Sequence, residues 1–309
     1  MRDEALRRPE RWRPALRRAI SGAPDQISVA AAALLDQIGE QQDVAPLRSF
    51  ARRGKANIGV ALLGRGLARR LAPRVWIEDL GHLEVLVGSR VVIGADIRRK
   101  VLALLCYLVT KPGLRAQREE VLDALWPDLE PGSALNSLNQ TAYFLRRVFE
   151  PDYDEDVSPG YVQQSAEFIW LDSELVTARS QRCREQIRLA VRSGNSADVL
   201  AVARDYRGRF ALDFLYEDWA SPYRDGLHGA YLQLVESTLR GDIDGGEFTR
   251  GIQLAQAATE VEPEAEELHL ALIKLYRLSG AHAAAAEEYG RYAAILRDIG
   301  VEAPRFEEV

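Results

Sequence analysis

Cysteine and histidine are scarce in this chain, and long apolar runs are missing. Its 309 residues include two cysteines, Cys106 and Cys183, which stand too far apart in sequence to suggest a disulfide framework or a cysteine zinc site. The four histidines stand alone, without the spacing of metal ligands. No segment approaches the roughly 18 apolar residues that a membrane span needs, and the N-terminus lacks the apolar core of a signal peptide. We therefore expect a cytoplasmic protein that carries no metal and no other cofactor.

Groups of residues that would support catalysis are missing as well. The carboxylate pairs Asp154/Glu155 and Glu307/Glu308 lie in polar loop or tail sequence, where solvated charge is the ordinary explanation. No Ser-His-Asp arrangement follows from helical or strand spacing, and no phosphate-binding loop of the GxxxxGK(S/T) kind occurs. We therefore expect that the protein is not an enzyme.

Charge is distributed unevenly along the chain, which is long enough for two or three domains. The net charge is −6, but residues 1–74 carry +8, residues 75–172 carry −7 and residues 173–309 carry −7. Affinity for duplex DNA comes largely from neutralised phosphates. The acidic middle segment therefore argues against DNA binding unless a basic face forms locally.

Residues 1–73 are predicted to be helical, with arginine-rich faces. The stretch from Val29 to Arg53 resembles one HEAT-type repeat, in which Gly39 stops a helix and the next helix is entered through Asp43 and Pro46. A single repeat cannot bury its own apolar face, so the segment either packs on the following domain or belongs to a longer protein. Its arginines are more simply explained as a solvated face than as contacts with nucleic acid. The apolar stripe consists of Ile27, Ala31, Leu34, Leu35 and Ile38.

Residues 74–172 show the order of a winged-helix domain. Strands are predicted at 75–77, 83–87 and 90–93, with a two-residue hairpin turn at Gly88-Ser89. A helix with an apolar stripe follows and ends before Pro112-Gly113, and a second helix runs from Arg118 to Trp126. After a third helix, YVQQ at 161–164 and FIWLD at 168–172 form another hairpin. In this layout the third helix enters the major groove and the last hairpin is the wing.

The third helix is predicted from Ser133 to Glu150, with Ser133 as its N-cap. One side is apolar at helical spacing, the pattern of a face packed on a core. The other side carries groups that bind base edges and phosphates. We interpret the stretch as a DNA recognition helix, and an ordinary amphipathic helix with a solvated polar side is the alternative. The apolar residues are Leu138, Ala142, Leu145 and Phe149, and the polar residues are Asn136, Asn139, Gln140, Tyr143, Arg146 and Arg147.

From about Leu175 the chain is predicted to be helical to its end, with a period of 34 residues. At this offset Gly246 pairs with Gly280, and Leu239 pairs with Ile273. This is the period of the tetratricopeptide repeat, which has two antiparallel helices per unit. Such arrays present a surface to a peptide, a protein or a second copy of themselves. We therefore expect an interaction role for this segment.

Several stretches occur together in an order typical of one regulator family. They are RRKVLALLCYLV at 98–109, REEVLDALWPD at 118–128, ALNSLNQTAYFLRR at 134–147, YRGRF at 206–210, EDWA at 217–220 and YR at 223–224. With them, residues 74–300 resemble the SARP-type activators (Streptomyces antibiotic regulatory proteins), which join an OmpR-type winged helix to a bacterial transcriptional activator domain. The N-terminal helical segment departs from the short members of that family, which begin almost directly with the winged helix.

The resemblance implies roles for particular residues. The six polar residues of the third helix would lie on or beside the DNA face. Arg98, Arg99 and Lys100, at the start of the first helix, would lie where a contact with the DNA backbone can form. The loop 127–132 corresponds to the segment that contacts RNA polymerase in OmpR-type proteins, and its Asp128 and Glu130 suit a basic partner surface.

The expected fold is mainly α. It comprises a HEAT-like helical segment at 1–73, an OmpR-type winged-helix α+β domain at 74–172 and a tetratricopeptide-like bacterial transcriptional activator domain at 173–309. The expected function is that of a DNA-binding transcriptional activator that binds repeats in double-stranded promoter DNA as a homodimer and recruits RNA polymerase, with no membrane partner. The alternative is a non-catalytic interaction scaffold whose winged helix no longer binds DNA, and the acidic balance of residues 75–172 is the best argument for it.

Overall fold

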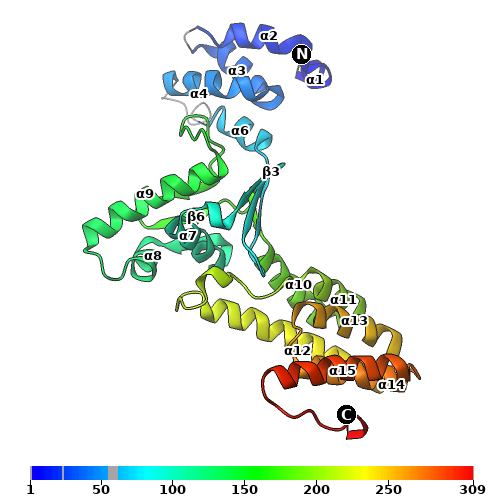
Figure 1. The fold of residues 1–309 in the computed structure, drawn as a ribbon. Helices are drawn as coiled ribbons and strands as arrows, with labels where there is room; N and C mark the ends of the chain where they lie inside the picture. The colour runs from blue at the N-terminus through cyan, green and yellow to red at the C-terminus, as the bar shows by residue number, and fades with distance from the viewer. Residues whose placement is uncertain (1, 23, 55–61, 309) are drawn as a thin grey trace. The chain divides into compact units, whose positions relative to one another are not determined.

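The computed structural model describes residues 2–22, 24–54 and 62–308 (Figure 1). The chain divides into two compact units, of which unit 1 contains residues 1–77 and 85–177 and unit 2 contains residues 78–84 and 178–309. Helices predominate and the strands form small sheets, so the predicted fold class is confirmed. Among the described residues, no helix is long and apolar enough to cross a membrane, and no cluster of three or more His, Cys, Asp or Glu side chains could hold a metal ion.

The N-terminal helices of unit 1 share one apolar core. They are α1 (Arg2–Arg7), α2 (Pro9–Ala19), α3 (Gln26–Ile38), α4 (Val44–Arg53) and α6 (Arg65–Leu71), with a 3-10 turn η1 at Gln41–Asp43. Asp25 starts α3, because its carboxylate accepts the backbone N–H of Ser28. The predicted apolar stripe of α3 is buried from Ala31 onward, but Ile27 is 77% exposed. Ile27 belongs to the stripe by its spacing but lies outside the core, because helical periodicity does not say how far along a helix the core extends.

Several arginines of the N-terminal segment form ion pairs with carboxylates of the same segment. Arg17 donates from Nε to Asp43 Oδ1 at 2.6 Å and from Nη2 to Glu40 Oε2 at 3.0 Å. Arg13 pairs with Glu40 as well. The predicted solvated face is therefore wrong at these positions, where the guanidinium groups tie α2 to the turn before α4.

Other arginines of this segment bind residues near the end of the winged helix. Arg48 is largely buried and donates to the backbone carbonyl of Asp156 at 3.0 Å, while Arg52 pairs with the carboxylate of Asp156. Arg69 pairs with Asp172 and Glu174. Of the two alternatives for the N-terminal segment, packing on the following domain is thus observed.

The rest of unit 1 contains the predicted strands, helices and hairpin in the predicted order. One sheet has the strand order β3-β2-β1-β7, formed by β1 (Val75–Glu78), β2 (Glu84–Val87), β3 (Arg90–Ile93) and β7 (Val176–Ala178). The helices are α7 (Arg99–Thr110), α8 (Arg118–Leu125) and α9 (Pro131–Phe149), with 3-10 turns η2 (Gly94–Asp96) and η3 (Pro112–Leu114). A second sheet, of order β4-β6-β5, is formed by β4 (Arg115–Gln117), β5 (Val162–Gln164) and β6 (Phe168–Leu171).

The first hairpin is confirmed, since β2 and β3 are joined by Gly88-Ser89 and Gly88 has a positive φ of 59°. Strands β4 and β7 were not predicted from the sequence. Each is three residues long, and each forms only by pairing with a strand distant in sequence, so no local alternation marks it.

Unit 2 consists mainly of successive helices. They are α10 (Arg179–Ser193), α11 (Ser196–Asp205), α12 (Ser221–Gly245), α13 (Phe248–Val261), α14 (Glu266–Leu278) and α15 (His282–Asp298), with 3-10 turns η4 (Leu212–Phe214) and η5 (Phe306–Glu308). Gly246 and Gly280, which are equivalent in the 34-residue period, follow α12 and α14 and have φ values of 74° and 80°. The period therefore corresponds to two helix pairs, α12-α13 and α14-α15, in each of which a left-handed glycine follows the first helix.

The motif YRGRF has a structural role in unit 2. Tyr206 is buried and stacks on Tyr231 with ring centroids 3.9 Å apart. Phe210 forms a β-bridge with Leu80, in the segment 78–84 that joins unit 2 from between β1 and β2. Gly81 has a φ of 78° there, and a Cβ at this position would lie 2.4 Å from the carbonyl oxygen of Arg207. Only glycine fits this approach of two backbones.

The same short segment buries a carboxyl group. Asp79 Oδ1 accepts the backbone N–H of Ser180 at 2.8 Å, and Oδ2 accepts the hydroxyl of Ser180 at 2.6 Å. Burial raises the pKa of Asp79 from 3.8 to about 7, although both bonds from Ser180 act in the opposite direction. Between these two pH values the folded protein keeps a proton that the unfolded chain releases, so this group makes the fold less stable as the pH rises.

Replacing Asp79 with Asn should remove this dependence while keeping the shape of the side chain. From pH 4.5 to 7, we expect the free energy of unfolding of Asp79→Asn to rise relative to that of the unmodified chain, by up to about 1.4 kcal/mol per pH unit for one proton. Urea denaturation across this range measures the difference. Asp213→Asn, at an exposed position in η4, is the control and should leave the curve unchanged. Parallel curves for Asp79→Asn and the unmodified chain would contradict the assignment.

Candidate nucleic-acid interface

Helix α9 packs with the apolar face that was predicted for it. Leu138, Ala142 and Leu145 are completely buried, and Phe149 is 2% exposed. The helix begins at Pro131, and Glu130 occupies the N-cap position. The prediction that Ser133 is the N-cap is therefore wrong. Proline suits the first turn because it has no N–H to leave unpaired, so the N-cap lies three residues earlier than predicted.

The opposite face of α9 is exposed and polar. Asn136, Asn139, Gln140, Tyr143 and Arg147 are all exposed. They lie within one stripe at helical spacing, which α9 holds rigidly because its other face is packed. Such a row can present amide, phenol and guanidinium groups to base edges and phosphates.

Arg146 differs from the other predicted residues. It is half-buried, its Nε donates to the carbonyl of Val162 at 3.2 Å, and its guanidinium lies 5.6 Å from the ring centroid of Tyr153. The side chain therefore fastens α9 to β5 and the stretch that precedes it. A contact of Arg146 with DNA stays a prediction.

Arg118 joins the exposed face of α9 to the wing, and it was not among the predicted residues. It stands at the start of α8, donates from Nη2 to Asn139 Oδ1 at 2.9 Å, and donates from Nη1 to the carbonyl of Ser165 at 3.1 Å. Ser165 lies in the turn between β5 and β6. The orientation of the Asn139 amide is thus set by Arg118, with its Nδ2 donor left for another acceptor.

The hairpin β5-β6 forms the wing. Its two strands pair antiparallel, and β4 pairs along the other edge of β6. Arg115 of β4 is exposed, and its guanidinium lies 3.8 Å from the ring centroid of Phe168, a cation–π contact. Arg115 and Arg118 therefore add positive charge at the wing that a residue list confined to α9 misses. Arg118 is the first residue of the motif REEVLDALWPD and begins α8, so the motif could have pointed to it.

The three basic residues at the start of α7 partly serve packing. The Arg98 guanidinium lies 3.9 Å from the ring centroid of Phe144 on α9. Lys100 Nζ donates to the carbonyl of Leu125 at 2.6 Å, at the C-terminus of α8. All three side chains, including that of Arg99, are exposed. Their contact with the DNA backbone stays a prediction.

The loop between α8 and α9 is exposed at residues 127–130. Asp128 and Glu130 flank Leu129, which is itself 44% exposed. An apolar side chain between two carboxylates is a surface suited to a basic partner with a small apolar contact.

Comparisons with known proteins agree with this arrangement. Residues 171–305 match the family described as the bacterial transcriptional activator domain. The regulatory protein AfsR of Streptomyces coelicolor is 31% identical over 229 residues, which cover 70% of this chain and 21% of that protein. AfsR of Streptomyces griseus is 27% identical over 231 residues, covering 72% of this chain and 23% of that protein. The chain thus spans about a fifth of the length of these relatives.

A solved structure shows a similar fold. The structure of Mycobacterium tuberculosis EmbR in complex with a low-affinity phosphopeptide matches 76% of this chain and 63% of that one, with a TM-score of 0.52 and 20% identity. Together these matches confirm the resemblance to SARP-type activators.

Mutation can test the expected division between side chains that read bases and side chains that supply charge. On a DNA site selected from a random pool, Asn139→Ala should cost about 1–3 kcal/mol of discrimination at one base position. Arg147→Ala should weaken binding to all sequences alike. Fluorescence anisotropy with single-base variants of the site measures both effects.

Arg118→Ala should relax specificity at the same base position as Asn139→Ala, because it frees the Asn139 amide to rotate. The double variant should then lose less than the sum of the two single losses. Full additivity, or a loss at a different base, would contradict the positioning role of Arg118.

Proposed function

Because the chain carries a bacterial transcriptional activator domain and resembles the SARP-type activators, we propose that it is a DNA-binding transcriptional activator. It reads promoter repeats through α9 and the β5-β6 wing, and it recruits RNA polymerase. It has no catalytic activity, and it acts in the cytoplasm, where promoter DNA lies.

The observation that supports this proposal best is the pair of hydrogen bonds from Arg118. They bring Asn139, in the middle of the polar face of α9, and the turn of the wing into one surface. A helix that only displays a solvated polar face has no need of such a bridge. In winged-helix proteins the recognition helix and the wing contact adjacent grooves, so their relative position must be held.

The acidic balance of residues 75–172 weighs less against DNA binding than the sequence suggests. Asp156 and Asp172 are neutralised by Arg52 and Arg69 of the N-terminal segment. Helix α9 contains no Asp or Glu, so no carboxylate of the helix itself lies on its exposed polar face. The charge relevant to DNA is the local one, to which Arg115, Arg118 and Arg147 contribute.

Polymerase recruitment is assigned to the exposed loop with Asp128 and Glu130. Pairing of two copies on a promoter repeat is assigned to unit 2, whose helices resemble an array that presents an interaction surface. Two copies supply twice the phosphate contacts, which offsets the small number of basic side chains on one copy.

Gel retardation of promoter DNA tests the proposal. We expect specific retardation whose affinity falls with salt, with a log–log slope of roughly −4 or steeper, because each neutralised phosphate contributes about 0.9. Arg11→Gln, which removes an exposed arginine far in sequence from α9, should leave the slope unchanged. A slope near zero, or equal retardation of all sequences at low salt only, would favour the scaffold alternative. A protein that remains monomeric on saturated DNA in ultracentrifugation would contradict the dimer.

A further inference from the structure

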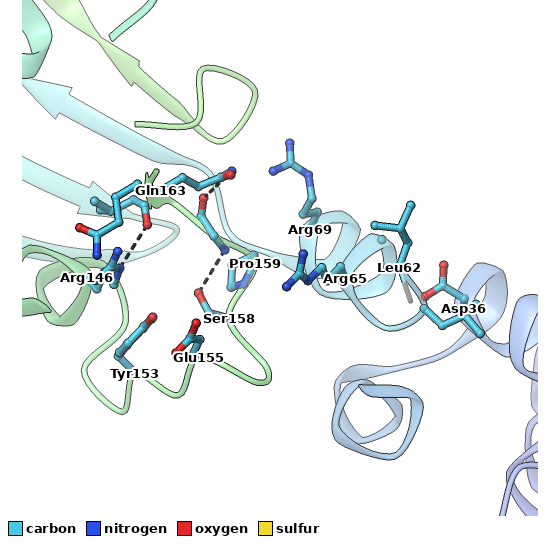
Figure 2. A pocket seen from close by; sticks show the side chains of 15 residues that line it. Asp36, Leu62, Arg65, Arg69, Arg146, Tyr153, Glu155, Ser158, Pro159 and Gln163 are labelled. Atoms are coloured by element: carbon cyan, nitrogen blue, oxygen red, sulfur yellow. Dashed lines mark hydrogen bonds between the residues drawn. The ribbon is translucent and has the colours of Figure 1, made fainter. Parts of the chain in front are cut away.

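A cavity of about 760 Å³ lies within unit 1, between α6 and the stretch that joins α9 to β5 (Figure 2). Its volume falls in the range of sites for small organic ligands, roughly 300–1,000 Å³. Helix α6 supplies Arg65 and Arg69, α9 supplies Arg146, and the joining stretch supplies Tyr153 and Glu155. Apart from Arg146, none of these residues has been given a role in DNA binding.

The three arginines differ in what already binds them. Arg69 forms ion pairs with Asp172 and Glu174. Arg146 uses only Nε, toward the carbonyl of Val162, and its two Nη groups make no hydrogen bond with the described residues. The Arg65 side chain is exposed and makes no hydrogen bond or ion pair within the described part of the chain, while its backbone N–H donates to the carbonyl of Leu62 at 3.1 Å. In Figure 2 the Arg65 side chain points from α6 toward Ser158 and Glu155. Arg146 lies beyond these two residues, on the side of the cavity opposite α6.

The carboxylates that line the cavity, Asp36 and Glu155, form no ion pair with Arg65 or Arg146 among the described residues. Asp36 is engaged with the start of α6, since its Oδ1 accepts the backbone N–H of Gly64 at 2.7 Å. Glu155 is exposed. Burial lowers the pKa of the neighbouring Arg48, and the positive charge of Arg65 lowers it further. Both carboxylates keep their charge, but the Arg65 guanidinium and the two Nη groups of Arg146 keep N–H donors that an anion can accept.

We propose that this cavity binds a small phosphate-bearing molecule, with its phosphate group between Arg65 and Arg146. A guanidinium group binds two oxygens at once. A phosphate group has enough oxygens to accept hydrogen bonds from guanidinium groups on two walls of the cavity. A carboxylate has two oxygens, which one guanidinium group occupies. The cavity is larger than a phosphate ion, so the molecule carries an organic part. Occupancy joins α6 of the N-terminal segment to the C-terminal end of α9.

Titration calorimetry of the full chain with adenosine monophosphate and with inorganic phosphate tests this proposal. We expect saturable binding of adenosine monophosphate with a Kd below about 1 mM, and weaker binding of inorganic phosphate. Arg65→Gln and Arg146→Gln should each weaken binding about tenfold or more, because each removes a charge-assisted pair of hydrogen bonds. Arg11→Gln removes the same charge from an exposed position of α2 and should bind as the unmodified chain does.

Other outcomes would overturn the proposal. It is wrong if neither probe binds saturably, or if Arg11→Gln weakens binding as much as Arg65→Gln does, since the attraction would then be general. Thermal unfolding shows whether each variant folds, and Arg65, being exposed, should be replaceable without loss of stability. The proposal does not depend on DNA binding. If Arg65→Gln impairs retardation of DNA while neither probe binds, the cavity arginines contact DNA phosphates instead.

Discussion

Ion pairs tie the N-terminal helices to carboxylates near the wing, and the position of α6 and the charge left on unit 1 depend on them. Arg69 binds Asp172 and Glu174 at the approach to β7, and Arg52 binds Asp156 in the stretch between α9 and β5. Burial alone would raise the pKa of Asp172, but the hydrogen bonds and charge of Arg69 outweigh it and keep the pKa below its ordinary value. The carboxylate is thus charged at neutral pH, and the pair fixes α6 against the wing sheet, where it forms one wall of the cavity.

This pairing also explains how an acidic segment can present the surface that we propose to bind DNA. The excess positive charge of residues 1–74 and the excess negative charge of residues 75–172 partly cancel inside unit 1. What remains at the exposed face of α9 and at the wing is polar and locally basic, with Asn139 oriented by Arg118. In the function that we propose, specificity comes from amides held in place by neighbouring side chains. In the same proposal, affinity comes from the pairing of two copies, because few basic side chains lie at the exposed face of α9 in the part of one copy that the structure describes.

Much of the fold could be predicted because its signals are local. The apolar face of α9, the turn Gly88-Ser89 and the left-handed glycines 246 and 280 each follow from spacing within a few residues or from one repeat period. Apart from the N-cap of α9, the misses concern interactions over long separations in sequence or the extent of the core. Strands β4 and β7 form only against distant partners, Ile27 lies outside the core that covers the rest of its stripe, and Arg118 acquires its role by reaching Asn139 and Ser165.

The sequence by itself therefore determined which segments are helices or hairpins, which face of each is apolar, and the resemblance to SARP-type activators. Periodicity, turn residues and motif order are properties of the sequence itself, so they can be recognised before the fold is known. Only the tertiary structure decided how the charges are used. A carboxylate and an arginine a hundred residues apart, such as Asp172 and Arg69, carry no mark of their pairing in the sequence. Only folding brings them together. It also places Arg65 and Arg146 at one cavity, where guanidinium N–H groups of both remain without a partner among the described residues.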